Sequence, residues 1–116
     1  MNPTPIQSSA FASTPRPPYY AVIFSSRRNG HGEPEYAATA QRMAELVMQQ
    51  PGCLGFESTR DAEGFGITVA YFDSEANILQ WRKHPEHAAA RERGKREWYE
   101  HFEVRVAKVE RAYNGP

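Results

Sequence analysis

Two segments of this 116-residue chain have the pattern of β-strands that are apolar on both faces. They are "YYAVIFSS", residues 19–26, and "ITVAYF", residues 67–72. A strand with one face in water alternates apolar and polar side chains, whereas these two carry apolar side chains at both odd and even positions. The sheet that contains them must therefore be covered on both faces.

The remaining periodicities give the order strand, helix, hairpin, broken helix, strand. A loop at 27–34, rich in glycine and proline, follows the first strand. The other predicted elements are a helix at 35–50, a β-hairpin at 53–73, helices at 74–84 and 85–99, and a strand at 102–113. This βαββαβ order matches the α+β ferredoxin-like fold, an antiparallel four-stranded sheet with its helices on one face.

A ferredoxin-like sheet leaves one face bare, and the chain has no further element to cover it. A second copy of the same sheet is the most economical cover for an apolar face. We therefore predict a homodimer.

Three positions refine these elements. Pro85 suits the first turn of a helix, where its missing N–H is not needed, so the joint between the two later helices is predicted at His84. Gly94 inside the second of these helices costs about 1 kcal/mol relative to alanine, which indicates a close approach there. Val109 breaks the alternation of the last strand, so a bulge or face switch is predicted near Val106 and Ala107.

Residues 1–18, "MNPTPIQSSAFASTPRPP", differ in composition from the rest of the chain. They hold five prolines and a cluster of serine and threonine, with only Ile6 and Phe11 as bulky apolar side chains. Such a segment buries too little surface to offset the entropy of ordering it. We expect a mobile tail, or an arm lying on a neighbour, followed by a single domain at 19–116.

Composition excludes several classes of function. Fourteen basic and fourteen acidic residues leave no net charge, so the field that attracts a nucleic-acid backbone is absent. No apolar stretch approaches the ~20 residues that cross a bilayer, and no secretory signal begins the chain. We expect a cytoplasmic protein that binds neither nucleic acid nor membrane.

The metal-binding residue types are few. Cys53 is the only cysteine, which excludes an internal disulfide and a cysteine-cluster metal site. His84 and His87 are separated by a helix start at Pro85, and no histidine–carboxylate spacing typical of metal sites occurs. We predict no metal site and a core position for Cys53.

Five segments together resemble the antibiotic biosynthesis monooxygenase superfamily of dimeric α+β barrels. They are "YYAVIFSSR", "QPGCLGFES", "GITVAYFDS", "NILQWRKHPEHAAAR" and "WYEHFEVRVAKVERAY". The similarity covers residues 19–113. It implies a pocket between helices and sheet in each protomer. Members include cofactor-independent oxygenases that form quinones, quinol monooxygenases and haem-degrading monooxygenases.

The haem-degrading members of this superfamily resemble one another in three shared residues. These are an asparagine at the end of the first strand, a tryptophan on the middle helix, and an iron-ligating histidine ten residues after the tryptophan. Trp81 matches the tryptophan, but Arg91 stands at the ligand position and "SS" at 25–26 replaces the asparagine. Guanidinium has no lone pair to give a metal. His87, one turn before Arg91, is the alternative axial ligand.

The quinone-forming members resemble one another in a shared pair, an asparagine and a tryptophan four residues apart on the middle helix. A tyrosine follows six residues after the tryptophan. Asn77 and Trp81 keep that spacing, and His87 holds the tyrosine position. The resemblance implies that His87 takes a substrate proton, that Asn77 donates to the developing oxyanion, and that Trp81 walls the substrate ring. The alternatives are a core tryptophan, an exposed asparagine and a histidine satisfied on its own helix face.

Aromatic side chains along the strands complete the predicted pocket. The predicted lining residues are Tyr20, Phe24, Phe56, Tyr71 and, on the same helix face as His87, Arg91. Barrel core is the alternative assignment for the strand aromatics.

The leading hypothesis is a small oxygenase that acts on an aromatic or quinol-like substrate without a tightly bound cofactor. A non-catalytic dimeric barrel that binds a small hydrophobic ligand is the second hypothesis. Haem binding with degradation is the third.

Overall fold

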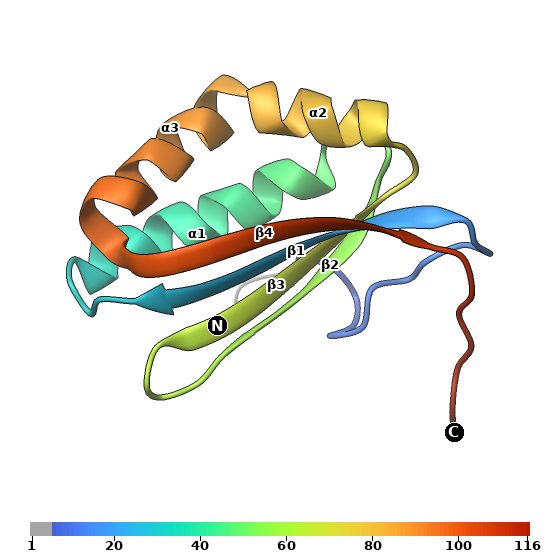
Figure 1. The fold of residues 1–116 in the computed structure, drawn as a ribbon, viewed down its shortest axis with the longest axis horizontal. Coiled ribbons are helices and arrows are strands. Elements are labelled where there is room, and N and C mark those ends of the chain that lie inside the picture. Colours follow the sequence, from blue (N-terminus) through green and yellow to red (C-terminus); the bar gives the residue numbers. More distant parts are fainter. Residues whose placement is uncertain (1–5) are drawn as a thin grey trace.

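The elements follow the predicted βαββαβ order (Figure 1). A computed structural model describes residues 6–116. The elements are β1 (Tyr19–Arg28), α1 (Glu33–Met48), β2 (Cys53–Arg60), β3 (Phe65–Phe72), α2 (Glu75–Lys83), α3 (Pro85–Arg93), a π-helical turn η1 (Gly94–Trp98) and β4 (Tyr99–Val109). The ferredoxin-like prediction is confirmed.

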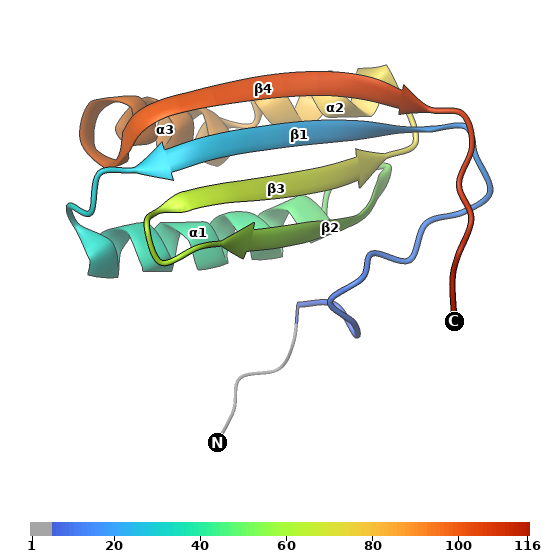
Figure 2. The ribbon, with the colours of Figure 1, turned by 60° about the horizontal axis from the view of Figure 1, so that its bottom comes forward.

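The four strands form one antiparallel sheet in the order β2-β3-β1-β4. Figure 2 shows the three helices together on one side of this sheet. Val22 pairs with Ala70 and with Val106, and both Val22 and Ala70 pack on the helix-borne core, so this row lies on the helix-facing side. Side chains one position along each strand lie on the opposite side, here called the open face.

The core lies between α1, α2 and the sheet. Leu46 and Val47 of α1, Phe72 of β3 and Trp81 of α2 are its buried members, and Phe72 is fully buried. The partly buried residues packed against them are Val22, Met43, Met48, Cys53, Phe56, Ala70 and Ile78. Cys53 therefore has the core position expected for it.

The break between α2 and α3 lies at the predicted joint. The Ser74 hydroxyl accepts the Asn77 N–H and begins α2. His84 ends α2 and begins α3, where its Nδ1 accepts the Glu86 N–H at 3.2 Å. Pro85 follows at the first helical position, because no intrahelical partner is lost there.

The last helical segment ends where it was predicted to end, but its final turn is π-helical. α3 ends at Arg93 and the chain continues through η1 into β4 at Tyr99. A Cβ at Gly94 would lie 2.8 Å from the Tyr99 ring, so the close approach indicated by this glycine is made by an aromatic side chain.

The predicted bulge near Val106 and Ala107 is wrong. β4 pairs with β1 in one register from His101 to Val109, and the irregularity lies between Arg27 and Arg28. Val109 pairs with Tyr19, an open-face position, whereas Val106 lies on the helix-facing side. β4 is an edge strand, so apolar side chains can stand on both of its sides without a change of phase.

The described part of the predicted tail, residues 6–18, lies along β2 of its own chain (Figure 2); residues 1–5 are outside the described residues. The Gln7 amide donates to the Phe56 carbonyl at 2.6 Å and accepts the Phe56 N–H at 3.3 Å. The Ala12 N–H donates to Glu57 Oε2 at 3.2 Å. The two Gln7 bonds satisfy backbone groups of an edge strand, which otherwise invite pairing with another chain.

The open face is covered unevenly. Near the segment of residues 6–18, here called the arm, Tyr19 and Ala21 are each only 5% exposed. Toward the β2–β3 turn, Phe65 is 39% and Ile67 38% exposed. The uncovered apolar surface therefore lies at the end of the open face away from the arm.

Candidate active site

The first site component is a stacked pair, here called the tryptophan–histidine stack, formed by Trp81 and His87. The two rings are parallel within 8°, with centroids 4.0 Å apart. Trp81 is 8% exposed and belongs to the core, so its indole is both a packing residue and the wall against which the imidazole lies. Trp81 lies on α2 and His87 on α3, so the stack joins the two helices across the joint at His84.

The hydrogen bonding of His87 determines which of its nitrogens is free. Nδ1 lies 2.9 Å from the Trp81 carbonyl oxygen. A carbonyl oxygen only accepts, so Nδ1 carries the hydrogen and Nε2 holds the lone pair. No hydrogen bond to Nε2 occurs within residues 6–116. The imidazole therefore presents one unused acceptor.

Burial lowers the pKa of His87 to about 4, and the positive charge of Arg91 adds to the shift. A neutral imidazole is the stable form at neutral pH. His87 is thus a hydrogen-bond acceptor in the resting protein and a poor store for a proton.

Arg91 lies one turn after His87 on α3. Its Nη2 donates to the Arg82 carbonyl at 2.9 Å, whereas its Nε is buried and, within residues 6–116, has no partner. A buried N–H without an acceptor costs free energy that a ligand oxygen would recover. Arg91 therefore offers positive charge and one unpaired donor next to His87.

Asn77 lies in the first turn of α2, and its side chain lies against Gly52 in the turn between α1 and β2. Its Nδ2 donates to Asp73 Oδ1 at 2.8 Å. A Cβ at Gly52 would lie 2.3 Å from that Nδ2, and Gly52 has a φ of 77° that glycine adopts without strain. The side-chain hydrogen bond of Asn77 thus goes to Asp73, and none joins it to Trp81 or His87.

The strand aromatics divide between the two sides of the sheet. Tyr20 and Phe24 share the helix-facing side with Val22, and Phe56 packs against the core. Tyr71 pairs with Ala21 and lies on the open face, where its hydroxyl donates to Glu57 Oε1 at 2.6 Å. Burial and this carboxylate raise the pKa of Tyr71 to about 12.

The placement of Tyr71 with the other lining residues is therefore wrong. A strand that is apolar on both faces carries no phase signal, so the sequence does not tell which of its aromatics face the helices.

A second site component was not predicted from the sequence. We call it the tyrosine–arginine cluster: Ser26 of β1, Tyr36 of α1, Arg60 of β2 and Tyr99 of β4. Arg60 Nη2 donates to Ser26 Oγ at 2.9 Å and to the Tyr36 hydroxyl at 3.2 Å. The Tyr36 and Tyr99 hydroxyls are 3.2 Å apart. Burial, and then the Tyr36 hydroxyl, raise the pKa of Tyr99 well above its usual range.

Arg28 supports this cluster from one side. Its side chain is 3% exposed and pairs with Glu33. Its guanidinium donates to the carbonyls of Trp98 at 2.6 Å and His31 at 3.1 Å, and lies 3.8 Å from the centre of the Tyr36 ring. Arg28 thereby ties the β1–α1 loop to η1.

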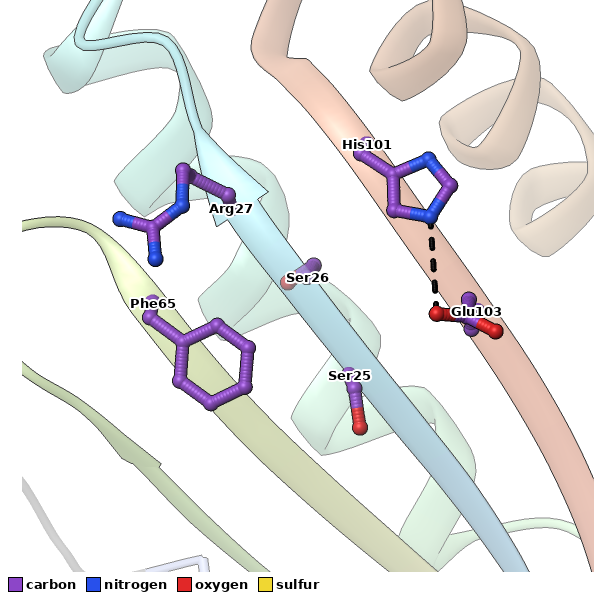
Figure 3. Close-up of a pocket in the computed structure, with 6 residues that line it drawn as sticks. All are labelled: Ser25, Ser26, Arg27, Phe65, His101 and Glu103. Atoms are coloured by element: carbon purple, nitrogen blue, oxygen red, sulfur yellow. Dashed lines mark ion pairs between the residues drawn. The ribbon is translucent and has the colours of Figure 1, made fainter.

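Two surface depressions lie elsewhere. One, of about 370 Å³, runs between α1 and α3 and is crossed by the Arg42–Glu86 ion pair at 2.8 Å. The other, of about 160 Å³, is on the open face (Figure 3), where His101 Nε2 lies 3.6 Å from Glu103. Neither is lined by the predicted catalytic residues.

Residues 6–116 contain neither a candidate metal cluster nor a candidate membrane-spanning helix. No group of three or more histidine, cysteine, aspartate or glutamate side chains is placed to hold a metal ion. None of the helices in this range has the length and apolarity needed to cross a membrane.

Comparison with known proteins identifies the family. The family model for antibiotic biosynthesis monooxygenases matches residues 18–93. The chain belongs to this family. It is also 55% identical over 100 residues to the uncharacterized protein YqjZ of Bacillus subtilis, a match that covers 86% of this chain and 87% of YqjZ.

Solved structures share the antibiotic biosynthesis monooxygenase fold. SnoaB of Streptomyces nogalater, described as a cofactor-independent oxygenase, superposes with a TM-score of 0.70 at 11% identity, covering 83% of this chain and 97% of SnoaB. Rv0793 of Mycobacterium tuberculosis has a TM-score of 0.70 at 18% identity, covering 82% of this chain and 99% of Rv0793. At these identities the likeness establishes the fold alone.

Proposed function

We propose that this family member is a small oxygenase that transfers one atom of O₂ to an aromatic or quinol-like substrate without a tightly bound cofactor. The observation that carries the proposal is the neutral His87, whose Nε2 has no hydrogen bond within residues 6–116, stacked on Trp81 with Arg91 one turn away. Family membership and the description of SnoaB support the class of reaction.

The reaction balances without another reductant. A phenol and O₂ give a quinone and water: one oxygen atom forms the new C=O, and the other leaves as water with the two hydrogens that the substrate loses. The substrate supplies all the electrons. The protein has to orient the phenol, favour its electron-rich anion and keep the site dry.

His87, Trp81 and Arg91 have separate roles in this proposal. His87 Nε2 accepts the substrate O–H, which orients the ring against the Trp81–His87 surface. With a pKa of about 4, the imidazole directs the hydroxyl and does not hold the proton in the resting protein. As the reaction begins, the hydroxyl proton passes to His87 Nε2, and the Arg91 charge, with its unpaired Nε–H, stabilises the phenolate that forms.

The residues fit the haem alternative poorly. Arg91 occupies the position of the iron ligand in haem-degrading relatives and donates to the Arg82 carbonyl. At the end of β1, Ser26 Oγ accepts from Arg60, and Ser25 lies on the open face. The His87 ring is already covered on one side by Trp81 at 4.0 Å.

Oxygen uptake tests the proposal. An oxygen electrode should record O₂ consumption with at least one member of a panel of hydroquinones and phenols, and His87→Ala should reduce the rate by about 100-fold or more. His101→Ala, on the open face, is the matched control and should leave the rate unchanged. Silence with every substrate, or equal rates in both variants, contradicts the assignment.

We also propose that the open face packs against a second copy of the chain. Phe65 and Ile67 are more than one-third exposed there, on a sheet side that the helices do not cover. Ile67→Glu should convert the dimer to a monomer in light scattering, whereas Leu79→Glu, at an exposed position on α2, should not. A monomeric wild-type protein excludes this arrangement.

A further inference from the structure

The tyrosine–arginine cluster contains a positive charge with no nearby counter-charge. Within residues 6–116, Arg28 pairs with Glu33, but no carboxylate lies within ion-pair distance of Arg60. All recorded partners of the Arg60 guanidinium are neutral: the Ser26 and Gly64 carbonyls, the Ser26 hydroxyl and the Tyr36 hydroxyl. A partly buried charge paired only with neutral dipoles is stabilised further when an anion approaches.

The two tyrosines of the cluster also hold one unused donor. The Tyr36 and Tyr99 hydroxyls share one hydrogen bond at 3.2 Å, and the Tyr36 oxygen also accepts from Arg60. Two hydroxyls carry two hydrogens, and their mutual bond uses one of them. Tyr99 donates in this bond, so the Tyr36 O–H has no acceptor among the described residues. This O–H lies next to Arg60 and is available to a ligand or to water.

Two glycines make room for this arrangement. A Cβ at Gly66 would lie 2.7 Å from Arg60 Cζ, so the guanidinium lies directly over the β3 backbone. A Cβ at Gly94 would lie 2.8 Å from the Tyr99 ring. Neither glycine has a positive φ, so space, and not backbone conformation, requires glycine at both positions.

Apolar surface adjoins the polar groups on the same side of the sheet. The Phe24 ring lies 5.4 Å from the Tyr99 ring and 5.7 Å from the Phe102 ring. Val104 pairs with Phe24 in the sheet and is 48% exposed on the helix-facing side. An aromatic ring that lies on Phe24 and Val104 would place a charged substituent toward Tyr99 and Arg60.

We propose that Arg60 and the Tyr36–Tyr99 pair bind the ionised oxygen of an aromatic anion, a carboxylate or a phenolate, whose ring packs on Phe24 and Val104. The site is built from β1, α1, β2 and β4 and does not include His87. It therefore goes beyond the oxygenase proposal, and binding to it requires neither O₂ nor turnover.

Calorimetric titration of the full chain with two matched probes tests the site. 2-Naphthoate carries the anion, and 2-naphthalenemethanol is its neutral counterpart. Wild-type protein should bind naphthoate about tenfold to a hundredfold more tightly, the range expected for a hydrogen-bonded charge. Arg60→Met should reduce this preference to about onefold. Arg27→Met removes an arginine from the open face of the same sheet and should keep the preference.

Two further variants guard against a folding defect in Arg60→Met. Arg60→Lys retains the charge and should keep a reduced preference, with the near-ultraviolet circular dichroism of Trp98 checking the fold. Tyr36→Phe/Tyr99→Phe removes the unused donor and should weaken naphthoate binding severalfold with little change for the alcohol. 4-Nitrophenol separates the two anion types, because its absorbance shows whether the bound form is the phenolate.

The results separate this site from the oxygenase proposal. Preference for naphthoate without O₂ uptake on any quinol leaves the anion site standing and removes the oxygenase. O₂ uptake with equal binding of the two probes does the reverse. Equal affinities in the wild type, or equal losses in Arg60→Met and Arg27→Met, overturn the anion site.

Discussion

The two ends of helix α1 rest on chemically different parts of the same sheet side. At its C-terminal end, Val47 packs into the core with Phe72 and Trp81, next to the neutral His87. At its N-terminal end, Tyr36 lies between Arg28 and the hydroxyls and guanidinium of the tyrosine–arginine cluster. Tyr36 and Val47 are separated by about 16 Å along the helix axis. The C-terminal end of α1 is therefore apolar and lies near an unused acceptor, whereas its N-terminal end is charged and lies near donors. Figure 1 shows the course of α1 along the sheet between these two ends.

The difference shows that burial alone does not make a catalytic group. Both ends contain titratable side chains that are mostly removed from water. At the Trp81 end burial keeps His87 uncharged, so its chemistry is that of a lone pair. At the Tyr36 end burial keeps Tyr99 protonated, so its chemistry is that of a donor. The variants below test whether the ends differ in this way.

The largest effect is expected from Trp81→Ala. Trp81 belongs to the buried core, and removing its indole leaves a cavity that the neighbours cannot fill. The free energy of unfolding should fall by about 3 to 5 kcal/mol in urea titrations. Leu79→Ala, at a 49%-exposed position two residues away, should cost less than about 1 kcal/mol. Equal losses in the free energy of unfolding for the two variants would contradict the assignment of Trp81 to the core.

Arg28→Met tests the opposite end against a neighbouring arginine. The substitution removes donors to the Trp98 and His31 carbonyls and the contact with the Tyr36 ring. We expect a loss of about 2 to 3 kcal/mol. Arg27→Met removes an exposed arginine on the other face and should cost about 0.5 kcal/mol or less. Urea midpoints that agree within error for the two variants contradict a structural role for Arg28.

Local patterns predicted the elements, but long-range contacts determine the site. Pro85 is a local signal, and the joint between α2 and α3 lies where this signal places it. Arg60 meets Tyr36 and Ser26 only because β1, α1 and β2 converge, and no spacing along the chain encodes that meeting. In the sequence, Arg60 lies at the polar end of a strand and has the pattern of a surface residue. Only the structure shows that its guanidinium packs over Gly66.

The catalytic and lining residues show the same limit. Residue spacing correctly predicts that Asn77 and Trp81 lie on one helix. It does not predict the hydrogen bond that the Asn77 side chain donates to Asp73. Tyr71 was assigned to the wrong sheet side because its strand is apolar on both sides. The roles of His87, Asn77 and Trp81 stay predictions until turnover is measured.

The pH dependence of stability tests the neutral state of His87. The folded-state pKa lies near 4, below the usual 6.5, so the unfolded chain binds a proton more readily than the folded one between these values. Stability from this group is present above pH 6.5 and is lost as pH falls toward 4. Wild-type protein should lose about 2 kcal/mol more than His87→Gln between pH 7 and 4.5. His101→Gln should follow the wild type, and parallel curves for all three would refute the buried neutral imidazole.

Gly94→Ala should have the smallest effect, and its sign tests the packing of Tyr99. The φ of −58° and ψ of −44° at Gly94 are helical, so alanine alone should stabilise this position by about 1 kcal/mol. The new Cβ would lie 2.8 Å from the Tyr99 ring, and the strain should outweigh that gain and give a net loss of about 1 kcal/mol. In a Tyr99→Leu background the ring is gone, so the same Gly94→Ala change should become stabilising. Urea titrations of the four proteins measure this coupling. Additive effects would mean that Gly94 does not make room for the Tyr99 ring, and Gly66 would then be the one glycine that the anion site requires.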